Sequence, residues 1–196
     1  MESANNGSRR QFLIRSATGL SAAWMLANWP AILSAHEHAR QGADSANYKL
    51  EFFSGGQAKE VEAVAAQIIP SDDTPGAREA RVVYFIDRAL TTFDRDQQST
   101  YTNGLEELDK TVADMFPGKA QFSSLSNEEQ IKLLTAIEKT EFFERVRVHT
   151  IMGFVADPSY GGNFNQIGWK LIGFENQSMH QAPFGYYDAE AAKQNS

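Results

Sequence analysis

The sequence predicts a small all-α protein, a bundle of about five helices followed by an irregular C-terminal segment rich in glycine and aromatic residues. Apolar residues recur at spacings of three and four in five segments between residues 57 and 155, which is the period of an amphipathic helix. Proline and glycine separate these segments, and no run of alternating residues indicates a sheet. The length of 196 residues suits one domain.

The five predicted helices follow from their periodicity and end signals. The first runs from Gln57 to Pro70, the second opens after Pro75 and reaches about Leu90, and the third covers about 96–115. The fourth begins at the capping box Ser126-Asn127-Glu128-Glu129, and the fifth runs from about Glu141 to a break at Asp157-Pro158. Beyond that break, a helix longer than two turns is predicted only at residues 165–172. Residues 40–56 are polar, end in Gly-Gly and predict a linker, so the helical domain covers 57–196.

Residues 1–39 predict an export signal of the twin-arginine type. A basic lead precedes a weakly apolar stretch rich in Ala, Gly and Ser, which is the order of a signal peptide. The alternative is an N-terminal amphipathic helix that contains an arginine pair by chance. Ile14 stands where the usual pattern has lysine. The residues that match the pattern are Ser8, Arg9, Arg10, Phe12 and Leu13.

The apolar part of this signal is interrupted by Pro30 and is shorter than the ~20 residues that a membrane span needs. We therefore expect removal or simple tethering during export, with a cut near Leu33-Ser34-Ala35 or after Ala39. The twin-arginine route carries proteins that fold, take up a cofactor or join a partner before crossing. Because the chain has no cofactor motif, a partner is the expected reason for the route, and the location is periplasmic.

Composition excludes several classes of function. The formal net charge is −7, and residues 40–196 hold 15 basic and 23 acidic residues, which disfavours nucleic acid as a partner. The chain has no cysteine, which excludes thiolate metal sites and covalent haem attachment.

No constellation of residues predicts an active site. The chain has four histidines, His36, His38, His149 and His180, and the first two lie at the end of the signal, where a metal site would have little scaffold. His149 is expected to be a hydrogen-bonded core or interface residue. The pair Asp72-Asp73 precedes Pro-Gly and favours a helix cap over an acid–base pair. We assign no catalytic, cofactor-binding or metal-binding residue. A small hydrolase using His149, and a periplasmic module that binds sugars through its C-terminal aromatics, are kept as alternatives.

Two groups of segments resemble the gluconate 2-dehydrogenase subunit 3 family. Residues 68–77, Ile-Ile-Pro-Ser-Asp-Asp-Thr-Pro-Gly-Ala, followed by 82–90, are similar to its opening motif. Its closing motif is similar to 149–154, His-Thr-Ile-Met-Gly-Phe, to 157–163, Asp-Pro-Ser-Tyr-Gly-Gly-Asn, and to 168–174, Gly-Trp-Lys-Leu-Ile-Gly-Phe. The likeness covers about residues 57–176 in the same order.

The resemblance implies a small, non-catalytic γ subunit of a membrane-associated sugar or sugar-acid dehydrogenase. A large flavoprotein of the glucose-methanol-choline type then holds FAD, and a multihaem cytochrome c subunit with haem c can take the electrons. The small subunit is implied to help the flavoprotein mature and to carry it to the twin-arginine translocase and into the periplasm, at the inner membrane. The substrate stays open.

The Gly-rich, aromatic C-terminal segment is the candidate interface with that partner. Exposed aromatic residues among glycines suit an interface where backbones approach closely, but the same aromatics can close the core of the bundle itself. Both interpretations stay open from the sequence. The candidate residues are Asp157, Pro158, Tyr160, Gly161, Gly162, Asn163, Trp169 and Phe174.

Overall fold

The structure, a computed structural model, describes residues 49–176 and 193. The predicted signal, its cut sites, His36, His38 and His180 lie outside the described residues. The described part is all-α, as predicted, and contains no strand. Its α-helices are α3 (Gly55–Ile68), α4 (Val82–Thr91), α5 (Gln98–Met115), α6 (Asn127–Ile137), α7 (Glu141–Val155) and α8 (Ile167–Ile172). Short 3-10 turns lie at Arg95–Gln97, Phe122–Ser124, Pro158–Tyr160 and Phe164–Gln166.

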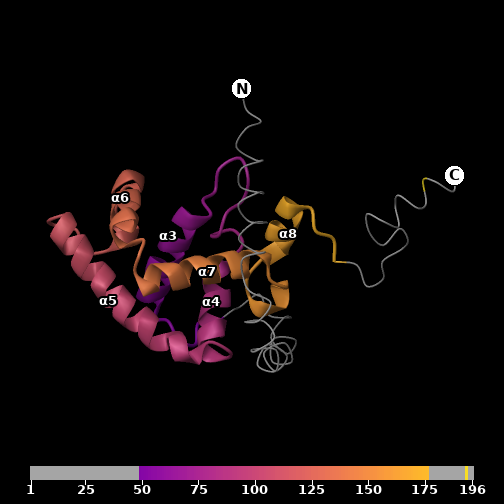
Figure 1. Cartoon of the computed structure of the whole chain (residues 1–196), viewed down its shortest axis with the longest axis horizontal. Helices are drawn as coiled ribbons and strands as arrows, with labels where there is room; N and C mark the ends of the chain where they lie inside the picture. The colour runs from indigo at the N-terminus through magenta and orange to yellow at the C-terminus, as the bar shows by residue number, and fades with distance from the viewer. Residues whose placement is uncertain (1–48, 177–192, 194–196) are drawn as a thin grey trace.

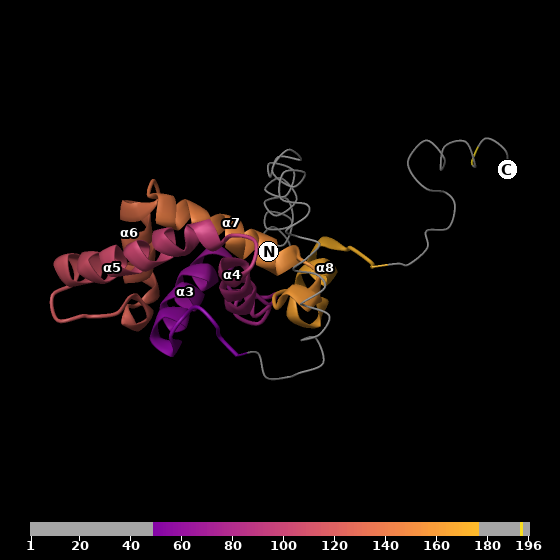
Figure 2. The same ribbon diagram turned by 90° about the horizontal axis from the view of Figure 1, so that it is seen from below.

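Helix α7 is the central element of the bundle. It runs through the middle of the molecule in Figure 1 and packs against α4, α3, α5 and α8. Figure 2 shows α3 and α4 next to each other beneath α5 and α7, with α6 at one end and α8 at the other. One hydrophobic core joins these elements. Its largest fully buried side chains include Tyr101, Phe122, Phe154, Ile86, Leu90 and Leu133.

Local capping signals fix where three of the helices begin. The Ser126 side chain accepts a hydrogen bond from the Glu129 amide, and the Glu129 carboxylate accepts one from the Ser126 amide, so the predicted capping box is confirmed. A second capping box joins Ser54 and Gln57. The Thr140 hydroxyl accepts from the Phe143 amide at the start of α7. Such caps satisfy amides that have no partner inside the helix.

Helix α4 begins later than predicted, at Val82 instead of directly after Pro75. The Glu79 carboxylate accepts hydrogen bonds from the Gly76 amide at 2.8 Å and from the Ser71 hydroxyl at 2.5 Å. Arg81 then adopts a left-handed backbone with φ 55°, which separates this turn from the helix. Asp72 accepts from the Thr74 amide at 3.0 Å, so it closes a local turn and does not cap α4.

The predicted linker is partly built into the domain. Helix α3 begins at Gly55, two residues before the predicted start, because Ser54 caps it. The buried Asp87 carboxylate of α4 accepts backbone amides from three successive residues: Glu51 at 2.7 Å, Phe52 at 3.0 Å and Phe53 at 2.8 Å. This clamp holds the Phe53 ring in the core, 5.6 Å from the ring of Tyr101.

Removing the clamp leaves three amides without their acceptor. We expect Asp87→Ala to lower the free energy of unfolding by about 2–3 kcal/mol, because hydrogen bonds to a charged group are strong and unsatisfied amides cost free energy. Urea denaturation followed by circular dichroism measures it. Asp73→Ala removes an exposed carboxylate and is the matched control, with an expected change within about 0.5 kcal/mol. Equal stability of both variants would contradict the clamp.

Candidate partner interface

The C-terminal segment turns back from α7 onto α4. The Asp157 carboxylate accepts from the Ser159 amide and starts a 3-10 turn that ends at Gly161, whose φ is +102°. Two bonds then tie the segment to α4 and the turn before it. The Phe164 amide donates to the Ala80 carbonyl at 3.1 Å, and the Arg88 guanidinium donates to the Ser159 carbonyl at 3.2 Å. The described part of the predicted irregular segment therefore packs against the bundle.

Two glycines let this segment touch the backbone of α7. A Cβ atom on Gly162 would lie 2.2 Å from the Gly153 carbonyl oxygen, and one on Gly168 would lie 1.7 Å from the Phe154 carbonyl oxygen. Real Cβ atoms do not come that close to a backbone oxygen. Glycine at these positions is therefore required by backbone contact within the fold.

Asn163 and Trp169 satisfy the last carbonyls of α7. The Asn163 side chain is fully buried, donates to the Ala156 carbonyl at 2.8 Å and accepts from the Gly168 amide at 2.8 Å. The Trp169 indole N–H donates to the Val155 carbonyl at 2.7 Å. Helix ends leave four carbonyls without a partner in the helix; Trp169 bonds the last of these, and Asn163 bonds the carbonyl of the C-cap residue that follows it. We call Gly162, Asn163, Gly168 and Trp169 the C-terminal lock.

Burial divides the eight predicted interface residues. Gly161, Gly162, Asn163 and Trp169 are buried within the chain. Asp157, Pro158 and Tyr160 are half-buried, and only Phe174 is largely exposed, at 49 %. Of the two interpretations left open by the sequence, the core role therefore applies to Trp169. Phe174 packs edge-on against the Trp169 ring at 5.1 Å and presents its other side to solvent.

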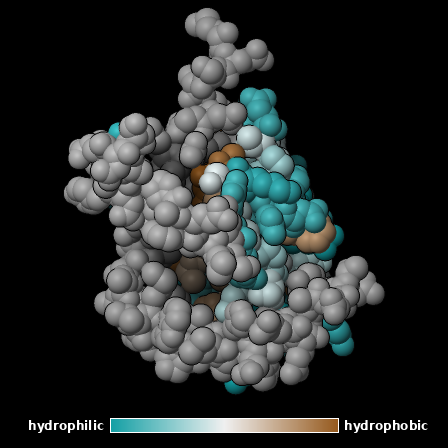
Figure 3. Space-filling view, turned by 90° about the vertical axis from the view of Figure 1, so that its right-hand side faces the viewer, coloured by the Kyte–Doolittle hydropathy of each residue, from teal (hydrophilic) through white to brown (hydrophobic). Residues whose placement is uncertain are grey.

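Sequence reasoning missed part of this surface. The Arg81 guanidinium lies 3.7 Å from the centre of the Phe164 ring, and Asn165 and Gln166 follow with left-handed φ values of 55° and 58°. Positive φ is uncommon outside glycine and clusters at binding sites. The Asn residues were a weak signal, since Asn tolerates this conformation, but nothing local marked Arg81. We call Arg81, Phe164, Asn165 and Gln166 the C-terminal face. In Figure 3, which looks onto the α8 end, the visible described surface is mostly hydrophilic with small hydrophobic patches.

A buried chain of three polar side chains crosses the bundle beside α7. His149 is completely buried, with Nε2 at 2.7 Å from Asp94 Oδ2 and Nδ1 at 2.9 Å from the Tyr101 hydroxyl oxygen. The Arg145 guanidinium lies 4.0 Å from the same Asp94 oxygen. A neutral imidazole protonated on Nε2 donates to Asp94 and accepts the Tyr101 hydroxyl proton, which gives each of the three a partner.

These three hydrogen-bonded side chains explain how a histidine can lie in the core, as expected. A catalytic His149 requires an open cleft, but the imidazole has no exposed surface and lies between the rings of Tyr101, at 5.8 Å, and Phe85, at 6.5 Å. The hydrolase alternative therefore has no geometry to support it. Among the described residues, no group of three His, Asp or Glu side chains is arranged to hold a metal ion.

The family model described as gluconate 2-dehydrogenase subunit 3 matches residues 56–175, more than half of the chain. The chain belongs to the gluconate 2-dehydrogenase subunit 3 family. No curated protein and no solved structure matches it significantly.

The match defines which part of the chain is the subunit 3 domain. It starts in the first turn of α3 and ends one residue after Phe174, so it includes α3 to α8 and the whole C-terminal lock. Both motifs that carried the resemblance lie inside it. Within the described residues, no helix combines the length and hydrophobicity that a membrane span requires.

The lock can be tested with a methyl group. We expect Gly168→Ala to lower the free energy of unfolding of this subunit 3 protein by about 2 kcal/mol or more, because its Cβ overlaps the Phe154 carbonyl. Gly55→Ala is the control, since no atom lies within 4 Å of its Cβ, and it should leave stability unchanged or raise it slightly. Thermal and urea unfolding measure both. Tolerance of Gly168→Ala would contradict the close backbone contact.

The buried Tyr101 of this hydrogen-bonded group predicts an effect of pH on stability. Burial raises the pKa of the Tyr101 phenol well above its ordinary value of about 10. Above pH 10 the unfolded chain loses this proton and the folded chain keeps it, so stability falls as pH rises. In the wild type, the Tyr101 phenol should lower the free energy of unfolding by about 1.4 kcal/mol for each pH unit above pH 10, and we expect Tyr101→Phe to lack this decrease. Urea midpoints between pH 9 and 11 compare the slopes. Identical slopes would refute the assignment.

Proposed function

We propose that this chain is the small, non-catalytic subunit of a periplasmic dehydrogenase complex, in which a separate FAD-containing flavoprotein oxidises a sugar or sugar acid. Its role is to help the flavoprotein mature and to carry it through the twin-arginine translocase. A multihaem cytochrome c with haem c is the electron acceptor that the proposal allows as a third subunit. Family membership supports the subunit role. FAD is assigned to the partner, so no residue of this chain is given to the cofactor.

The observation that best supports the export role is the order of two features in the sequence, an export signal followed by a subunit 3 domain. A Ser-Arg-Arg-x-Phe-Leu pattern at 8–13 precedes a subunit 3 domain that starts at residue 56. The twin-arginine route transports folded cargo, so a flavoprotein that lacks a signal can cross while bound to a chain that has one. The C-terminal face offers a contact for it, because Arg and aromatic side chains contribute strongly to protein interfaces.

The direct experiment purifies the chain with a C-terminal tag from periplasm and membranes. We expect a much larger protein to co-purify in a fixed ratio, with the visible absorption of a flavin, with or without haem. A colourless, monomeric chain would overturn the proposal and favour the sugar-binding alternative, which titration with monosaccharides at millimolar concentration then tests.

The export role makes a separate prediction. We expect the double variant Arg9→Lys, Arg10→Lys to leave both this chain and the flavoprotein in the cytoplasm, with periplasmic dehydrogenase activity reduced at least about tenfold. Arg15→Lys changes a third arginine of the same segment and is the control, with normal export. Fractionation and immunoblotting of both proteins measure it. Normal export of the flavoprotein with the double variant would show that it does not depend on this signal.

A further inference from the structure

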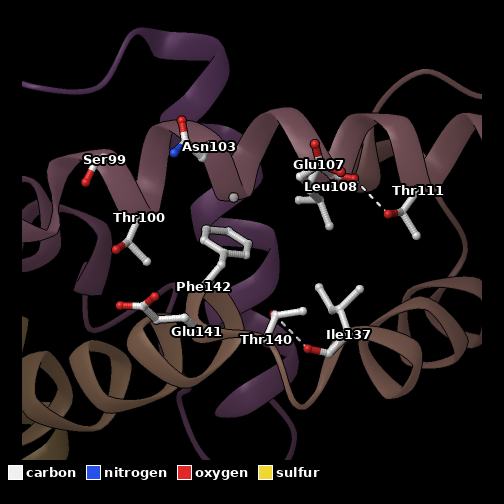
Figure 4. Close-up of a pocket in the computed structure, with 11 residues that line it drawn as sticks. Ser99, Thr100, Asn103, Glu107, Leu108, Thr111, Ile137, Thr140, Glu141 and Phe142 are labelled. Atoms are coloured by element: carbon white, nitrogen blue, oxygen red, sulfur yellow. Dashed lines mark hydrogen bonds between the residues drawn. The ribbon is translucent and has the colours of Figure 1, made fainter.

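A groove lies between α5 and the corner where α6 meets α7, at the opposite end of α7 from the C-terminal lock. It encloses about 480 Å³ (Figure 4). Helix α5 forms one wall, and the end of α6 with the start of α7 forms the other. Its lining includes Ser99, Asn103, Glu107, Leu108, Glu141 and Phe142.

The floor of the groove is apolar because of a glycine. The Phe142 ring lies directly against Gly104 of α5, where a Cβ atom would be 2.3 Å from the ring carbons. The Leu108 side chain continues this floor and is 2 % exposed. Any larger residue at 104 would separate the two helices, so the shape of the groove is set by the packing of the bundle.

The walls carry polar groups that the fold does not use. Within the described residues, the Ser99 hydroxyl, the Asn103 amide and the Glu141 carboxylate make no hydrogen bond or ion pair. Glu107 uses Oε1 to bind Lys110 at 2.6 Å, which leaves Oε2 without a partner in the described residues. Four side chains therefore border the apolar floor with hydrogen-bonding atoms that have no partner in the described part of the chain.

The groove is negatively charged. Its lining includes two carboxylates, Glu107 and Glu141, and no Lys, Arg or His. A neutral sugar can bond to hydroxyls and amides, but it brings no counter-charge to the Glu141 carboxylate, which makes no ion pair within the described residues. A cation with a long apolar stem matches both the floor and the walls, because its methylene groups cover the floor while its charged head stays at the acidic rim.

We propose that this groove receives an arginine side chain from the catalytic flavoprotein. This inference rests on the function proposed above. The planar guanidinium has five N–H donors in a fixed fork and binds a carboxylate through two of them, whereas the compact lysine ammonium acts as a point charge. Arginine is also enriched among the residues that contribute most to protein interfaces.

The first test removes the two charges and keeps the shape. We expect the double variant Glu107→Gln, Glu141→Gln to weaken binding to the flavoprotein by about tenfold or more, with an affinity less sensitive to salt than that of the wild type. Glu106→Gln, Glu128→Gln removes two exposed charges outside the lining and is the control, with an expected change below about twofold. The measurement is the dissociation constant of the purified flavoprotein and tagged chain at two ionic strengths.

The second test identifies the occupant. A photo-reactive amino acid at Ser99, on the rim, should cross-link to a flavoprotein peptide that contains arginine, as identified by mass spectrometry. A flavoprotein in which that arginine is changed to Glu should no longer bind the wild-type chain tightly. The same flavoprotein variant should bind the charge-reversed chain Glu141→Arg. Failure of this rescue, or a cross-link without arginine, would overturn the inference.

The outcomes separate this inference from the proposed function. If the wild type binds the flavoprotein and the Gln double variant binds equally well, the groove is not the contact and the subunit role stands. If the wild type does not bind it, the subunit role fails and this inference fails with it. Circular dichroism of each variant shows that a loss of binding does not come from unfolding.

Discussion

The contact between α7 and the C-terminal lock is the constraint on which the rest of the structure depends. Helix α7 packs against α3, α4, α5 and α8, so its position sets theirs. Its end is fixed by Asn163 and Trp169, which bond its last carbonyls, and by two glycines that allow backbone contact. A segment without regular long helices can hold a bundle together in this way because its hydrogen bonds and close packing replace the contacts that another helix would make.

Buried polar side chains supply the remaining long-range ties. Asp87 binds the backbone amides of residues 51–53 before α3. The hydrogen-bonded side chains of Asp94, His149 and Tyr101 connect the turn after α4 with α7 and α5. Glu60 binds Ser123, which holds the turn after α5 onto α3. Each of these groups has its partners, as burial requires. An acidic group beside a histidine resembles a catalytic pair, but full burial makes this one a structural element.

The two regions proposed to contact a partner lie at the two ends of α7. Glu141 and Phe142 of the groove are in its first turn, and residues 164–166 of the C-terminal face follow its last turn. A helix of 15 residues separates them by roughly 20 Å, since each residue adds ~1.5 Å. Because both regions adjoin one continuous helix, the length of α7 sets this separation. A flavoprotein that contacts both ends would be bound in one orientation, which suits a subunit that travels with a folded partner.

The sequence by itself determined the helical class, the start of α6, the ends of α7 and the family, because periodicity, caps and motifs are local signals. The predicted start of α3 was two residues late, because Gly55-Gly56 indicated a linker although Ser54 caps the helix there. The predicted start of α4 was too early, because no local signal in the sequence indicates the left-handed backbone of Arg81. Only the tertiary structure decided that Gly162, Asn163 and Trp169 belong inside the chain and Phe174 outside. It also decided that Gly104 and Phe142 form the floor of a groove. These outcomes depend on which segments of the backbone come into contact, and residues that are far apart in the sequence determine those contacts together.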